Sequence, residues 1–204
     1  MKNYNSRGQP QLERRSMTIR ELRIADDGEG TEKYIEGYAS VFDSWSEELG
    51  AGIAPFREKV CRGAFLETIE KDEIKALWNH NSDLVLGSKN AGTLELKEDE
   101  RGLYVKIKPP KWAKDKIETI KRGDVNCMSF GFCVVLDKWY SDGDCEVREL
   151  LKVKLFDVSP VAYPAYPATE CDVRSVYQTH EKRKKAAAAE KAAKRRGLEK
   201  AFDI

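Results

Sequence analysis

The stretch Asn126–Leu136, NCMSFGFCVVL, decides how the rest of the chain is interpreted. Bulky apolar and small side chains alternate along it with the period of two that a β-strand imposes. The bulky set predicts a strand face in the core: Met128, Phe130, Phe132, Val134 and Leu136. The opposite face begins with small residues, namely Cys127, Ser129, Gly131 and Cys133. We therefore expect the Ser129 hydroxyl to point away from the core, with room above it for another chain.

Outward from this strand, most of the chain is typical of β-structure. Alternation or apolar runs predict strands over 17–24, 34–42, 73–80 and 147–161, a hairpin over 92–108 and a turn over 137–146. A break at Gly63 followed by one or two helical turns is expected within 57–72, with Phe65, Leu66 and Ile69 facing inward. Prolines before 111 and Gly123 delimit a helix over 109–125. The pattern predicts a mainly β (α+β) fold with short flanking helices.

The charge distribution divides the chain into a body and two ends. The 204 residues have a net charge of +1, but residues 1–23 carry +4, residues 181–204 carry +5 and the middle carries −8. We expect a basic N-terminal arm over 1–16, one folded domain over 17–175 and a basic, Ala-rich helical tail over 176–204. No apolar run is long enough for a membrane span, and the first residues lack a secretory signal, so an intracellular protein is expected.

The sulfur and imidazole content argues against metal chemistry. Five cysteines form no Cys-x-x-Cys pair, and the chain has only two histidines. A zinc site or a disulfide framework is therefore not expected, and no cofactor is predicted.

Ser129 has two interpretations that the residues alone leave open. One is a serine tolerated on a half-exposed strand face, and the other is a nucleophile, which would need a base within hydrogen-bond reach. His80 is the candidate base, because it ends a predicted strand, whereas His180 lies in the basic tail and is not expected to be held firmly. A structural histidine at a strand end is the alternative role for His80.

An acid that orients the imidazole would complete such a group, and two candidates share a strand parity. Glu149 and Asp157 lie eight residues apart, roughly 26 Å on a straight strand, so only one could serve. Asp157 is embedded in the apolar run LFDVSPV, and a carboxylate there needs a partner, which favours it over Glu149.

The ordered motifs of the chain resemble those of the prohead (capsid maturation) serine proteases of tailed phages, the HK97-like type. The similarity covers about residues 17–172 and rests on Gly-Tyr-Ala, Gly-Ala-Phe, Asn-His before a Gly-containing loop, Glu-Asp-x-x-Gly-Leu, Met-Ser-Phe-Gly and acid-Val-Ser-x-Val. The resemblance implies that 17–175 is a prohead protease domain with a β-barrel core related to the herpesvirus assembly proteases. It matches Ser129 to the nucleophile, His80 to the base and Asp157 to the acid, where the family commonly carries Glu.

The same resemblance implies a function and a location. The protein would be a serine endopeptidase that cleaves the phage scaffold, the scaffolding segment of the major capsid protein, or itself, inside the immature capsid in the host cytoplasm. Its partners would be scaffold and capsid protein, and the sequence leaves a homo-oligomer open. No membrane partner is expected.

Two functions of other classes compete with proteolysis. One is a non-catalytic assembly or scaffold protein whose β domain binds capsid subunits. The other uses the basic ends as nucleic-acid arms, but the acidic body and the lack of aromatic residues among the Lys/Arg clusters argue against specific recognition.

Overall fold

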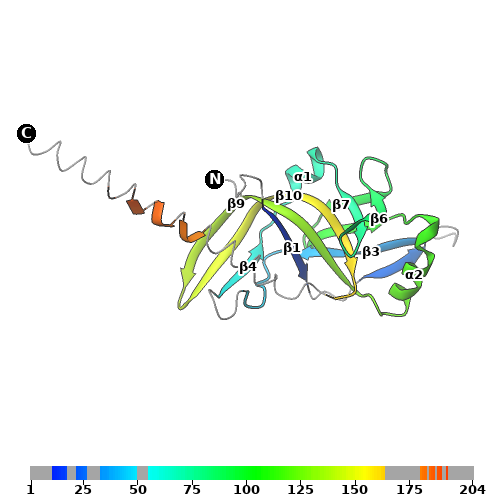
Figure 1. Cartoon of the computed structure of the whole chain (residues 1–204), viewed down its shortest axis with the longest axis horizontal. Coiled ribbons are helices and arrows are strands. Elements are labelled where there is room, and N and C mark those ends of the chain that lie inside the picture. The colour runs from blue at the N-terminus through cyan, green and yellow to red at the C-terminus, as the bar shows by residue number, and fades with distance from the viewer. Residues whose placement is uncertain are drawn as a thin grey trace, which may run out of the picture.

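The computed structural model describes residues 11–17, 22–26, 33–49 and 55–163, together with 180–182, 184–186, 188, 189 and 192. Most of these residues lie in strands arranged in two sheets, with two short helices at their margins (Figure 1). The predicted mainly β class is thus confirmed. A closed barrel like that of the herpesvirus proteases stays an expectation.

The first sheet holds the two longest strands at its centre. Its order is β1-β9-β10-β5-β6, and β4 pairs with the first part of β10, ahead of the residues that pair with β5. The bounds are β1 Leu12–Met17, β4 Phe56–Val60, β5 Lys75–Trp78, β6 Asn81–Ser88, β9 Cys127–Asp142 and β10 Cys145–Val161. β9 and β10 form a long antiparallel hairpin that extends beyond the body toward the C-terminal tail (Figure 1).

The second sheet closes the core from the other side. Its order is β2-β3-β8-β7, with β2 Arg23–Asp26, β3 Lys33–Val41, β7 Leu94–Glu98 and β8 Gly102–Ile107. The β7–β8 pairing confirms the predicted hairpin. Apolar side chains of both sheets form one continuous core, which includes Ile35, Leu103 and Ile107 on one side and Phe130 and Phe132 on the other.

Both predicted helical regions are present. Helix α1 (Leu66–Lys71) follows Gly63, and its preceding residue Phe65 is buried in the core, but Leu66 is 60% exposed instead of facing inward. A 3-10 turn, η1 (Lys111–Ala113), leads into α2 (Lys114–Lys121), which buries Ile120.

Two segments depart from the sequence prediction. Residues 137–146, expected as a turn, continue the β9–β10 hairpin, and only 143 and 144 lie between the strands, because 137–142 pair residue by residue with 145–150. Residues 12–16, expected in a solvated arm, belong to β1, which pairs along its length with β9. Leu136, expected in the core, is 45% exposed, since the register of β9 against β10 shifts beside it.

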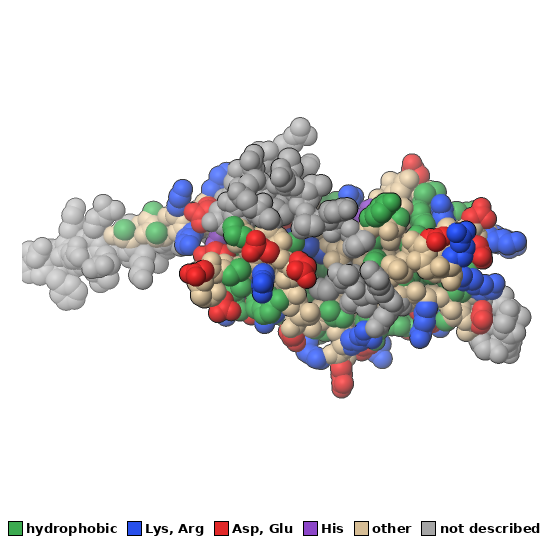
Figure 2. Space-filling view, turned by 90° about the horizontal axis from the view of Figure 1, so that it is seen from below, with side chains coloured by type: hydrophobic (Ala, Val, Ile, Leu, Met, Phe, Trp, Pro, Cys, Tyr) green, Lys and Arg blue, Asp and Glu red, His purple; other side chains and the backbone are tan. Residues whose placement is uncertain are grey.

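The ends of the chain are described only in part. Of the tail, the described residues between 180 and 192 are helical, while the predicted boundary at 175 lies outside the described residues, and a charged helix over 176–204 stays a prediction. Among described residues, no helix has the length and apolarity needed to cross a bilayer. On the face drawn in Figure 2, basic and acidic side chains are interspersed instead of forming one basic patch.

Candidate active site

Ser129 lies near the start of β9, between two neighbouring strands. Its register partners are Ser16 on β1 and Ser159 on β10. Its side chain lies on the face opposite Phe130 and Phe132, as the alternation predicts. The predicted room above the hydroxyl is not what the structure shows, because Ser129 is fully buried and its Oγ has two polar contacts.

His80 lies in the tight turn between β5 and β6. Trp78 and Asn81 pair across this turn, and both residues between them have positive φ, 51° at Asn79 and 58° at His80. Two central residues with positive φ are the mark of a type I′ hairpin turn. The turn is tied to the end of β10, where the Asn79 N–H donates to the Pro160 carbonyl at 3.0 Å.

Asp157 lies on β10 between the strands that carry the other two groups. It is in register with Gly131 on β9 and with Lys75 on β5, so it lies beside both Ser129 and the turn that carries His80. Its carboxylate rests on Gly131, where an added Cβ would overlap Oδ1. The absence of a side chain at Gly131 is therefore what leaves space for this acid.

The three side chains form a continuous hydrogen-bonded chain. His80 Nδ1 lies 2.6 Å from Asp157 Oδ2, and His80 Nε2 lies 2.6 Å from Ser129 Oγ. An ionised carboxylate only accepts hydrogen bonds, so the Nδ1 atom carries the proton and donates it to Asp157. In a neutral imidazole Nε2 is then an acceptor, free to take the hydroxyl proton of Ser129.

This is the juxtaposition that the resemblance to the prohead proteases implies. The model of the caudovirus prohead serine protease family matches residues 19–185. The chain belongs to this family. It is also similar to a "Prohead protease" of Enterobacteria phage HK97, with 30% identity over 131 residues, which is 61% of this chain and 53% of that protein. The chain thus aligns with about half the length of that relative, and no solved structure matches.

The other candidates of the sequence analysis lie away from Ser129, His80 and Asp157. Glu149 pairs with Lys59 at 3.1 Å and accepts a hydrogen bond from the Tyr140 hydroxyl at 2.9 Å. His180 is held more firmly than expected, because its ring stacks on Trp139 with 4.2 Å between ring centroids. Neither side chain contacts Ser129 or His80 in any described interaction.

Two cysteine thiols lie on the same strand as Ser129. Cys127 and Cys133 flank Ser129 on β9 and both are buried. Burial raises the pKa of the Cys133 thiol to about 11, so it is protonated at neutral pH and a weak nucleophile. Among the described residues, no group of three or more His, Cys, Asp or Glu side chains is placed to hold a metal ion.

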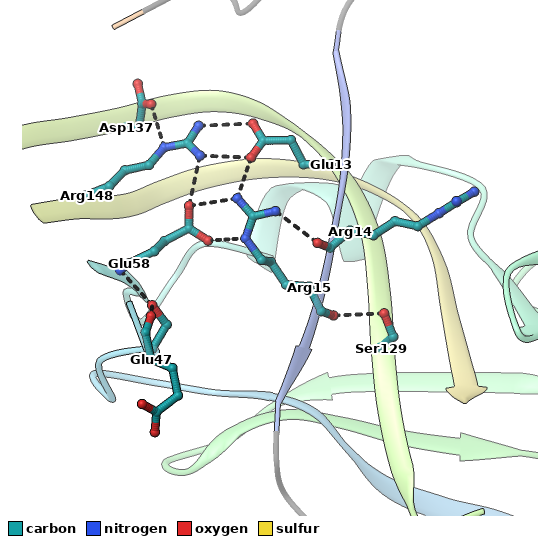
Figure 3. A network of polar contacts seen from close by, with 9 residues as sticks. Glu13, Arg14, Arg15, Glu47, Glu58, Ser129, Asp137 and Arg148 are labelled. Carbon is teal, nitrogen blue, oxygen red and sulfur yellow. Dashed lines mark hydrogen bonds and ion pairs between the residues drawn. The ribbon is translucent and has the colours of Figure 1, made fainter. Parts of the chain in front are cut away.

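A backbone carbonyl of β1 also reaches the serine. The Ser129 hydroxyl lies 2.9 Å from the Arg15 carbonyl oxygen, to which it can donate (Figure 3). One hydroxyl proton serves one acceptor at a time, so Arg15 O and His80 Nε2 compete for it. Sequence reasoning missed this contact, because it assigned Arg15 to a solvated arm.

A buried ion cluster fixes β1 in this position. The Arg15 and Arg148 guanidinium groups lie between Glu13 and Glu58, and each arginine approaches each of these two carboxylates to 2.8 Å. Arg148 also pairs with Asp137 at 3.0 Å (Figure 3). Burial alone would raise the pKa of Glu13, but the charges of Arg148 and Arg15 outweigh it and lower that pKa. The cluster joins four strands, β1, β4, β9 and β10, next to the site.

Two residues that the sequence analysis did not choose as site residues also contribute to the site. Gly131 makes room for Asp157, and Ser159 donates to the Asp157 carboxylate. The signal for Ser159 is present in the sequence, because residues two apart on a strand face the same side. The segment Asp157-Val-Ser159 therefore places a hydroxyl beside the acid.

Proposed function

We propose that this member of the prohead protease family is a serine endopeptidase with Ser129 as nucleophile, His80 as general base and Asp157 as the orienting acid. The observation that carries the proposal is the unbroken chain from Ser129 Oγ through the His80 ring to Asp157, with 2.6 Å at each step. A hydroxyl, an imidazole and a buried carboxylate in this order are what acyl transfer to serine requires.

The reaction follows from the donor and acceptor assignment. His80 Nε2 takes the proton of Ser129 as Oγ attacks the carbonyl carbon of the scissile peptide, and Asp157 stabilises the resulting imidazolium. When the C–N bond breaks, His80 gives that proton to the leaving amine. Water then enters, His80 takes one of its protons, and the hydroxide equivalent releases the acyl group and restores the hydroxyl of Ser129.

The family supplies the substrate class of the proposal. The chain would act in the immature capsid within the host cell, on the scaffold or on the scaffolding segment of the major capsid protein, and on itself where a site is accessible. The support is the match of residues 19–185 to the caudovirus prohead serine protease family.

The test is co-expression of this chain with the scaffold and major capsid protein of its own phage. We expect wild type to cleave them, and Ser129→Ala or His80→Ala to lower the cleavage rate by about 10⁴-fold or more while the protein stays folded. Ser40→Ala is the matched control, since Ser40 is also fully buried but lies on β3 and its hydroxyl contacts the Val41 carbonyl.

Each result has a defined meaning. Retained cleavage by Ser129→Ala would eliminate the serine mechanism. Intact scaffold and capsid protein with the wild-type chain would favour the non-catalytic assembly role. A lower mass for purified wild type than for Ser129→Ala would show self-cleavage.

A further inference from the structure

Ser159 is a buried hydroxyl next to the proposed catalytic residues that the mechanism above does not use. It lies on β10, two residues after Asp157 and in register with Ser129 on β9. It is fully buried, as Ser129 is. A hydroxyl in such a position needs hydrogen-bond partners, and the identity of those partners indicates its role.

Both hydrogen-bond partners of the Ser159 hydroxyl belong to proposed catalytic residues, Asp157 and His80. Its hydroxyl donates to Asp157 Oδ2 at 2.8 Å, and its oxygen accepts from the His80 backbone N–H at 3.3 Å. Asp157 Oδ2 is also the atom that accepts from His80 Nδ1. One carboxylate oxygen of Asp157 is thus linked to His80 in two ways. The His80 ring bonds it directly, and the His80 backbone N–H reaches it through the Ser159 hydroxyl.

His80 needs this support because of its backbone conformation. Both Asn79 and His80 have positive φ, a region that residues with a Cβ occupy at a cost and that persists only where the surroundings hold it. The contacts between this turn and β10 come from consecutive positions, with Ser159 holding the His80 N–H and the Pro160 carbonyl holding the Asn79 N–H. Only the first of them also reaches the acid.

We propose that Ser159 is a positioning residue that locks the Asp157 carboxylate and the His80 turn into one unit, so that the imidazole stays aligned with Ser129. The inference rests on the proposed serine mechanism and deepens it. Ser159 acts through the two residues it bonds and touches neither Ser129 Oγ nor the substrate.

The experiment measures the reactivity of Ser129 directly, with a fluorophosphonate as the probe. Ser129 Oγ forms a bond to phosphorus, fluoride leaves, and His80 takes the hydroxyl proton, so the labelling rate reports on the alignment of the pair. We expect Ser159→Ala to lower the limiting labelling rate by about 10- to 100-fold. The probe concentration at half-maximal rate should stay unchanged, because the Ser159 hydroxyl is engaged by Asp157 and His80.

A spectroscopic readout separates positioning from a general loss of structure. The His80 Nδ1 proton, bonded to Asp157 over 2.6 Å, should give a strongly downfield proton resonance. In Ser159→Ala we expect this resonance to broaden through faster exchange with water. Ser40→Ala, the buried serine on β3, should retain both the resonance and the wild-type labelling rate.

Two further variants make the result decisive. Ser159→Cys keeps the side-chain shape with a somewhat larger atom but donates and accepts weakly, and it decides the matter if the alanine variant does not fold. Ser159→Ala added to Asp157→Asn should reduce labelling by less than about twofold, because both changes act on the same unit.

Wild-type labelling rates and an unchanged downfield resonance in Ser159→Ala and Ser159→Cys would overturn the positioning role. If Ser129→Ala abolishes labelling in the same series, the proposed protease function survives that result. Labelling that persists in Ser129→Ala would instead remove the serine mechanism itself.

Discussion

At the scale of single residues, the acid beside His80 carries the most direct prediction. In Asp157→Asn, a neutral amide that both donates and accepts replaces a carboxylate that only accepts. The His80 ring therefore loses the partner that fixes its tautomer. We expect peptide cleavage to fall by about 10³- to 10⁴-fold with little change in folding. Glu149→Gln is the control, because Glu149 bonds Lys59 and Tyr140 instead, and its cleavage rate should match wild type. Equal losses in both variants would contradict the assignment of Asp157.

Gly131 carries a second prediction at this scale. A Cβ there would overlap Asp157 Oδ1, so Gly131→Ala must displace the acid or the strand. We expect the fluorophosphonate labelling rate to fall by about 100-fold. Gly92→Ala is a useful control, since its φ of 69° makes alanine unfavourable although the added Cβ meets nothing within 4 Å. It should lower stability by about 1 kcal/mol and leave labelling unchanged. Unchanged labelling in Gly131→Ala would show that the carboxylate does not need this space.

At the scale of elements, the ion cluster under β1 determines how firmly this strand is held. Arg148 is fully buried, and its removal leaves three carboxylates, Glu13, Glu58 and Asp137, with Arg15 as the remaining cation of the cluster. We expect Arg148→Met to lower the free energy of unfolding by about 3–5 kcal/mol in urea titrations. Arg23→Met, which removes an exposed partner of Glu36, should cost less than about 1 kcal/mol. A similar small loss at Arg148 would mean that the cluster does not stabilise the sheet.

The same cluster explains why β1 could not be predicted from the sequence. Strand alternation was sufficient for the first half of β9 and for the β7–β8 hairpin, because local side-chain parity separates the bulky face from the small one. It failed at β1, where Glu13 and Arg15 alternate with exposed residues but are charged, and charged residues are normally solvated. Their burial depends on partners far along the chain, since Glu13 and Arg148 are 135 positions apart. Pairing over that distance leaves no local pattern.

Most of the candidate site, unlike β1, could be predicted from the sequence. Ser129, His80 and Asp157 could be chosen from the sequence because each stands out from its neighbours in chemistry and the family motifs fix their order. Ser159 could have been chosen by parity with Asp157. The Arg15 carbonyl could not, because backbone groups carry no sequence signal and its approach to Ser129 depends on the register of β1 against β9.

At the scale of the whole molecule, the tail and the body meet at the β9–β10 hairpin. His180 stacks on Trp139, its Nε2 lies 3.6 Å from Glu146, and Lys184 pairs with the same carboxylate at 3.4 Å. Basic residues of the tail thus contact the acidic body. The opposite net charges of the tail and the body, seen along the sequence, favour this contact. Burial lowers the pKa of His180 although Glu146 opposes this, so the folded protein favours the neutral ring.

This arrangement predicts how stability depends on pH. The folded pKa of His180 lies below its ordinary 6.5, so the unfolded chain binds the extra proton first as pH falls through 6.5, and the free energy of unfolding declines until the folded ring is also protonated. The folded pKa of Glu13 lies below 4.5, and its contribution is lost in a second window below that pH. Urea titrations from pH 8 to pH 3 should therefore show two declines. His180→Gln should remove the upper decline and leave the lower one, whereas an unchanged upper decline would show that the tail contact with Trp139 does not contribute to stability in solution.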